Sequence, residues 1–97
     1  MPSFEPKFLG ELKAALAADG HADLAAQVDR LRVHELVEGR RPTSQFIYVV
    51  PKASLPEGEL SRMTLSGVAG LFCLLLSGGR IAVVETLSRD VLVRPNA

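Results

Sequence analysis

The sequence contains few of the residue types from which many functional sites are built. Its 97 residues include one cysteine, two histidines, one tyrosine and no tryptophan. A single cysteine excludes an intramolecular disulfide and a zinc site built from the cysteines of one chain. The two histidines, His21 and His34, lie on different predicted elements without carboxylates at ligand spacing. We therefore expect neither a metal site nor a cofactor.

The chain also lacks an excess of charge, a long apolar run and the common catalytic motifs. Eleven basic residues balance eleven acidic ones, which argues against nucleic-acid binding and against docking on an anionic membrane. The longest apolar run, residues 68–76, is too short for a membrane helix. The first residues include Glu5 and do not resemble a secretory signal, so we expect a cytoplasmic protein. No glycine-rich nucleotide loop or nucleophile elbow is present, which favours a protein that is not an enzyme.

The residues that are present predict one α+β domain over residues 1–97. Apolar residues at helical spacing predict helices over 6–19 and 22–32, separated at Gly20. Alternating and β-branched residues predict strands over 33–38, 45–50, 62–66, 70–77 and 80–87. We therefore expect an N-terminal helical hairpin on one face of a mainly antiparallel sheet with four to five strands.

The predicted hairpin GLFCLLLSGGRIAVVETLSR, residues 70–89, is apolar on both faces. A turn at Gly78-Gly79 predicts that Phe72 pairs with Glu85 on one face, and that Cys73 pairs with Val84 on the other. Antiparallel sheets commonly leave one face in water, so the second apolar face requires a cover.

Three covers are compatible with the sequence. They are the loop 51–59 with the C-terminal tail, a second copy of the chain, and a ligand or another protein. We favour a homodimer, because twofold dimers are the commonest oligomers. The candidates for its interface are Leu71, Cys73, Leu75, Val84, Ile47 and Val49.

Glu85 is the main candidate for a functional side chain. It lies near the end of an apolar strand, where partial burial raises the pKa of a carboxyl unless a base pairs with it. The possible bases are Arg89, Arg40, Arg41 and Arg62, and a structural ion pair at the sheet edge is the simpler interpretation. Cys73, within an apolar strand, is expected to be a buried and inert thiol. The full set of ligand or partner candidates is Glu85, Arg89, Arg40, Arg41, Tyr48 and His34.

Two segments resemble a family of small bacterial proteins of unknown function. FLGELKAALAADGHADLAAQVDRLRV resembles the helical pair of that family, and residues 79–89 match its Gly-x-Ile-x-x-Val-Glu-x-Leu-x-Arg hairpin. Members also carry a Cys-x-Cys…Cys-x-x-Phe segment, whereas residues 36–46 of this chain keep only Phe46. The resemblance supports the predicted layout and draws attention to Glu85 and Arg89, but it implies no activity.

These observations favour a small, non-catalytic interaction module that acts as a homodimer. The alternative is a small-molecule-binding protein, or a small enzyme, with a pocket near Glu85 and Arg89. A strongly perturbed carboxyl in a pocket would favour the alternative.

Overall fold

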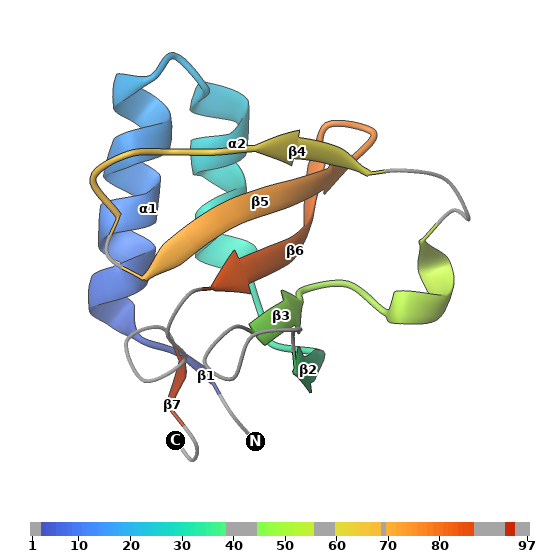
Figure 1. Ribbon diagram of the computed structural model, residues 1–97. Coiled ribbons are helices and arrows are strands. Elements are labelled where there is room, and N and C mark those ends of the chain that lie inside the picture. Colours follow the sequence, from blue (N-terminus) through green and yellow to red (C-terminus); the bar gives the residue numbers. More distant parts are fainter. Residues whose placement is uncertain (1–2, 39–44, 56–59, 69, 87–92, 95–97) are drawn as a thin grey trace.

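The computed structural model describes residues 3–38, 45–55, 60–68, 70–86 and 93–94, and it confirms the predicted α+β class (Figure 1). Two helices pack with a five-stranded antiparallel sheet in the order β2-β3-β6-β5-β4. Its strands are β2 Glu35–Glu38, β3 Gln45–Tyr48, β4 Ser61–Met63, β5 Leu71–Ser77 and β6 Arg80–Thr86. None of the helices in this described part has the length and apolar content needed to span a bilayer.

The helical hairpin consists of α1 (Pro6–Ala18), α2 (Ala22–Gln27) and a final 3-10 turn, η1 (Val28–Arg30). Pro6 occupies the first helical position, where its missing N–H costs no hydrogen bond. Gly20 ends α1 with φ of +82°, a backbone conformation that side chains disfavour. The second helix was predicted to continue to residue 32, but the chain tightens at Val28 and becomes extended at Leu31.

The first and last described segments pair with each other. Strands β1 (Ser3–Phe4) and β7 (Val93–Arg94) form a separate two-stranded antiparallel sheet. The Phe4 ring stacks on that of Phe8 in α1, with 5.7 Å between the ring centroids. The short sheet therefore fixes the entry of the chain into α1.

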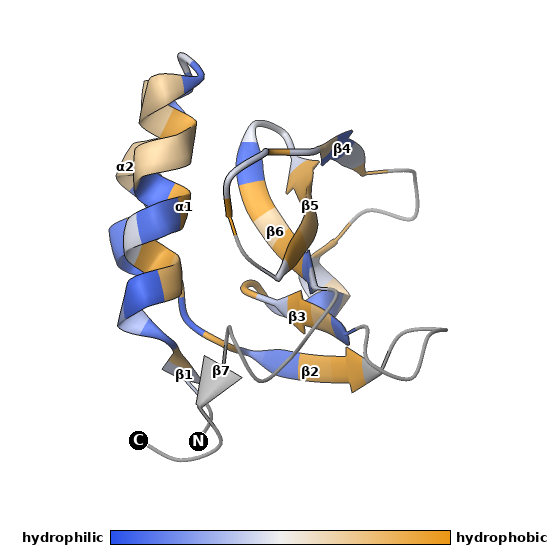
Figure 2. Ribbon diagram, turned by 60° about the vertical axis from the view of Figure 1, so that its left-hand side comes forward, coloured by the Kyte–Doolittle hydropathy of each residue, from blue (hydrophilic) through white to orange (hydrophobic). Residues whose placement is uncertain are grey.

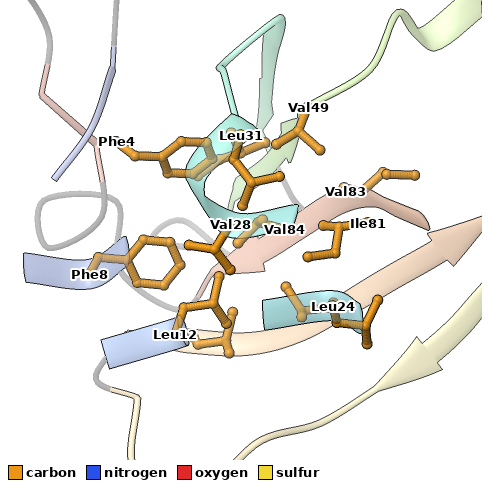
Figure 3. Close-up of a cluster of buried hydrophobic side chains, with 14 of the residues drawn as sticks. Phe4, Phe8, Leu12, Leu24, Val28, Leu31, Val49, Ile81, Val83 and Val84 are labelled. Carbon is orange, nitrogen blue, oxygen red and sulfur yellow. The ribbon is translucent and has the colours of Figure 1, made fainter. Parts of the chain in front are cut away.

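The core lies between the helices and one face of the large sheet, which we call the inner face. Residues that pair across neighbouring strands share a face. One such row crosses all five strands and contains Leu36, Ile47, Val84, Leu74 and Met63. Figure 3 shows Val28 of η1 beside Val84 of this row, and both side chains are almost fully buried. In α1, Phe8, Leu12 and Leu16 form the buried stripe.

The β5–β6 hairpin contains two irregularities that alternation did not predict. Its turn is as predicted, with Ser77 opposite Arg80 and positive φ at both glycines between them. The predicted register is wrong in the middle of the two strands, where Cys73 pairs with Glu85 and Leu74 pairs with Val84. One extra residue on each strand, Phe72 on β5 and Ala82 on β6, accounts for these two shifts. Such bulges place two successive side chains opposite one partner residue.

The edge strand β4 is shorter than predicted. It runs from Ser61 to Met63 and pairs only with Leu74–Leu76 of β5, whereas the alternating pattern predicted a strand over 62–66. Residues 64–65 have no regular structure, and Gly67 follows with φ of +83°. The part of β5 before Leu74 therefore has no described neighbour on its outer edge.

Candidate interaction surface on the outer face of the sheet

The face of the sheet that points away from the helices, the outer face, combines apolar and charged side chains. Figure 2 shows the helices on one side of the sheet, with the outer face turned away from them. One row across the outer face contains Glu35, Tyr48, Val83, Leu75 and Arg62. A second row contains Val37, Phe46, Glu85 and Cys73. The two rows have an apolar centre, and charged side chains occupy both ends of the first row.

A hydrogen bond joins Cys73 and Glu85 across β5 and β6. The Cys73 thiol donates to Oε1 of Glu85 over 3.2 Å, and the thiol is fully buried. The pKa of Cys73 is raised from its ordinary 9.0 to about 11, most of all by burial and further by the bond to Glu85 and the charge of that carboxylate. The positive charge of Arg62 acts in the opposite direction. The thiol is therefore protonated at neutral pH and is a poor nucleophile, as expected from the sequence.

The carboxylate of Glu85 is half-buried and has no ion-pair partner within the described residues. The ion pairs found in that part of the chain are Lys13 with Asp29, at 2.8 Å, and His21 with Asp19, at 3.3 Å. Of the bases expected to pair with Glu85, only Arg62 lies within the described residues, and it forms no ion pair with Glu85. A charged group in an apolar setting gains from an opposite charge brought by a partner.

Phe72 is the large apolar side chain that the described part of the chain leaves exposed. Its relative exposure is 37%, and it lies at the bulge where β5 passes opposite Glu85. In a bulge of this kind the extra residue and the next one point to the same side, so Phe72 shares the outer face with Cys73 and Glu85. The bulge therefore leaves an exposed aromatic residue on the stretch of β5 that passes opposite Glu85.

The connection between β3 and β4 contributes to the end of the outer face near the β5–β6 turn. It contains the 3-10 turn η2 (Lys52–Ser54) and the half-buried Leu55, which packs against the core cluster. The Lys52 ammonium lies 5.5 Å from the centre of the Tyr48 ring, a favourable cation–π distance. This end of the face is therefore partly covered by the connection.

Of the other predicted site residues, Tyr48 and His34 lie within the described part of the chain. Tyr48 is half-buried on β3, and its carbonyl accepts a hydrogen bond of 2.8 Å from the backbone N–H of the exposed His34. This is a backbone contact, so His34 and Tyr48 are neighbours without a shared catalytic geometry. Arg40, Arg41 and Arg89 lie outside the described residues.

Most of the predicted dimer-face residues are core residues of a single chain. Only Leu75 is partly exposed, whereas the other five have exposed fractions of 7% or less: Leu71, Cys73, Val84, Ile47 and Val49. Four of these five lie on the inner face, where Ile47 and Val84 share a row, and the bulge at Phe72 places Cys73 on the opposite face. Any interface on the outer face must therefore be built from other, more exposed residues.

Sequence reasoning did not identify the exposed residues that mark this surface. Phe72 was assigned to a face by simple alternation, and a bulge without glycine or proline leaves no sequence signal. Arg62 was considered only as a possible partner for Glu85, and Lys52 was not considered. Among the described residues, no group of three or more histidine, cysteine, aspartate and glutamate side chains could hold a metal ion.

Comparisons with known proteins do not assign a family to this chain. A scan against protein-family models, a search of curated proteins and a search of solved structures each find no match.

Proposed function

We propose that the protein is a small, non-catalytic interaction module of the cytosol that acts as a homodimer. Its interface is the outer face of the sheet, centred on β5. The observation that carries this proposal is the exposed Phe72 ring near the Glu85 carboxylate, which lacks an ion-pair partner within the described residues. An exposed aromatic residue near a carboxylate that pairs with no described base is typical of a surface that a partner protein completes.

The charges on this face are suited to a second copy of the same chain. Glu85 on β6 and Arg62 on β4 lie on opposite sides of β5 and share the outer face. A twofold axis parallel to β5 and above it places β6 of one protomer over β4 of the other. Because this axis keeps positions along the strands unchanged, each Glu85 then lies about two residues, roughly 7 Å, along the strand from Arg62 of the partner subunit. The long arginine side chain spans that offset, and the Phe72 and Leu75 side chains of both copies lie near the axis.

Two further features support an association without catalysis. The raised pKa of Cys73 keeps the thiol of the only cysteine protonated at neutral pH. The net charge of zero gives two copies little long-range repulsion. The structure therefore supports a contact surface more strongly than a catalytic centre.

Charge reversal tests this arrangement by sedimentation velocity. We expect the wild type to form dimers, Arg62→Glu and Glu85→Lys each to shift the equilibrium towards monomers, and the double variant to recover dimers. The recovery is expected because the reversed charges again attract each other. Phe72→Lys should also give monomers, since it replaces the exposed aromatic side chain of the proposed interface with a charge.

Arg30→Glu is the matched control. It reverses an exposed arginine in η1, outside the two outer-face rows, so it should leave the dimer intact. Thermal unfolding of each variant checks that the fold is retained. A wild type that is monomeric at every concentration, or a folded double variant that stays monomeric while the wild type dimerises, would contradict the proposed interface.

A further inference from the structure

A cleft of about 430 Å³ lies at the end of the molecule that carries the β5–β6 turn, away from the Phe72 surface. Three segments far apart in sequence form it: η1 with its flanking residues, the end of β3, and the turn itself. Its volume falls within the range of small-molecule sites in proteins. The cleft is lined by Gln27, Arg30, Leu31, Val49, Val50, Gly78, Gly79, Arg80 and Ile81.

The cleft combines an apolar floor with two cationic side chains. The floor consists of Leu31, Val49, Val50 and Ile81, whose exposed fractions are 7% or less. Arg30 from η1 and Arg80 from the turn contribute guanidinium groups, and both side chains are exposed. An apolar base with a few charged groups is the usual composition of a site that binds an organic ion.

Neither arginine is neutralised by an acid in the described part of the chain. The acidic neighbour of Arg30 in sequence, Asp29, accepts a hydrogen bond of 2.8 Å from Lys13. The ion pairs found among the described residues include neither Arg30 nor Arg80. Arg32, close to Arg30 in sequence, donates to the Leu31 carbonyl at 2.8 Å and also forms no ion pair among the described residues. Three arginines at this end of the molecule therefore lack an acidic partner in the described part of the chain, which favours the binding of an anion.

The Gln27 side chain holds one wall of the cleft in place. Its amide nitrogen donates to the Gly79 carbonyl over 3.0 Å, and its amide oxygen accepts from the Ile81 N–H over 2.9 Å. These two bonds fix the glycine turn against the helical hairpin. Arg80, between the two bonded residues, therefore projects from a backbone that is already ordered, which lowers the entropy cost of binding.

From this geometry we infer that the cleft is a binding site for a small organic anion. The ligand joins an apolar body, which packs on Leu31, Val50 and Ile81, to one carboxylate, phosphate or sulfonate group. That group accepts hydrogen bonds from Arg30 and Arg80, because guanidinium groups match the geometry of such oxyanions. The inference does not depend on the proposed homodimer, since Phe72, Glu85 and Arg62 do not line the cleft.

The fluorescent anion 8-anilinonaphthalene-1-sulfonate is a suitable probe, because it carries one sulfonate on an apolar ring system. We expect it to bind the native protein and to shift the amide signals of Gly78, Gly79 and Ile81 in nitrogen–proton correlation spectra. Arg30→Gln with Arg80→Gln should weaken binding by about tenfold or more, as for the loss of charged hydrogen bonds. N-phenyl-1-naphthylamine, which is the same molecule without the sulfonate, should bind the wild type and the double variant equally.

Two control variants separate this site from the outer face. Arg62→Gln removes an exposed arginine outside the cleft, and Phe72→Lys removes the exposed aromatic residue. Both should leave the affinity for the probe unchanged. Failure of the wild type to bind the probe, equal affinity in the Arg30 and Arg80 double variant, or loss of binding in Phe72→Lys would overturn the inference.

Discussion

Ionisation of the Cys73 thiol is expected to destabilise the folded protein in alkaline solution. The pKa of this thiol is raised from its ordinary 9.0 to about 11, first by burial and then by Glu85. Below pH 9 the thiol is protonated in both the folded and the unfolded chain. As the pH rises further, the unfolded thiol loses its proton first, so unfolding becomes more favourable until the folded thiol also ionises near pH 11.

The size of this effect follows from the two pKa values. A tenfold change in an equilibrium constant is worth about 1.4 kcal/mol. The interval between 9.0 and about 11 therefore corresponds to a loss of about 2.7 kcal/mol in the free energy of unfolding once the pH is well above 11. About half of that loss, ~1.4 kcal/mol, should be present at about pH 10.

Urea unfolding of the wild type and of Cys73→Ala, at about pH 8 and about pH 10, measures the effect. The substitution leaves a small cavity at both pH values, so the packing cost cancels when the two pH values are compared. The wild type should lose ~1.4 kcal/mol more stability than the variant over this interval.

Two results would refute this reasoning. One is an equal loss of stability in the wild type and in Cys73→Ala over that interval. The other is a native thiol that titrates near its ordinary pKa of 9.0, as followed by the ultraviolet absorbance of the thiolate. Either result would show that burial and Glu85 do not control the protonation of Cys73.

Four substitutions test other parts of the structure. Gln27→Ala should lower the free energy of unfolding, measured in urea, by about 1–3 kcal/mol, because the Ile81 N–H loses its side-chain acceptor. An unchanged free energy of unfolding would show that water replaces the amide. Glu85→Gln should lower the pKa of Cys73 from about 11 towards 9.0 without reaching it, since the charge is lost while the burial remains; an unchanged thiolate titration would contradict the assigned causes. Gly79→Ala should cost about 1–2 kcal/mol in thermal unfolding, because Gly79 has φ of +80°. Gly10→Ala, at an exposed helical position with nothing near the added methyl group, should instead stabilise, and an equal effect of the two glycine substitutions would refute the backbone argument.

The parts of the fold that depend on local chemistry were predictable from the sequence. The stripe of Phe8, Leu12 and Leu16 predicts a helix with one buried face, and Gly20 predicts its end. The Gly78-Gly79 pair predicts the hairpin turn, because both residues require positive φ. Each of these signals lies within a few residues of the element that it specifies.

The register of the hairpin was not predictable in the same way. Strict alternation places Phe72 opposite Glu85, whereas the extra residues Phe72 and Ala82 make Cys73 the partner of Glu85. Strict alternation would leave a serine hydroxyl at position 73 buried without a hydrogen-bond partner, at a cost of about 1–3 kcal/mol. A serine hydroxyl at this position has the Glu85 carboxylate within hydrogen-bond reach.

The candidate sites depend on contacts between distant segments. The arginine cleft joins Gln27, Val50 and Arg80, which are separated by more than twenty residues along the chain. No local pattern indicates that η1 packs beside the β5–β6 turn, so neither Arg30 nor Arg80 was a candidate at the level of sequence. The Phe72 surface likewise requires knowledge of the bulge.

The molecular mass in solution tests the central claim, the homodimer formed through the outer side of β5, most directly. We predict that light scattering over a concentration series gives a mass approaching twice that of one chain, and that Phe72→Lys gives the mass of a single chain at the same concentrations. A wild type that keeps the mass of one chain throughout, or a folded Phe72→Lys variant that dimerises as well as the wild type, would contradict the claim.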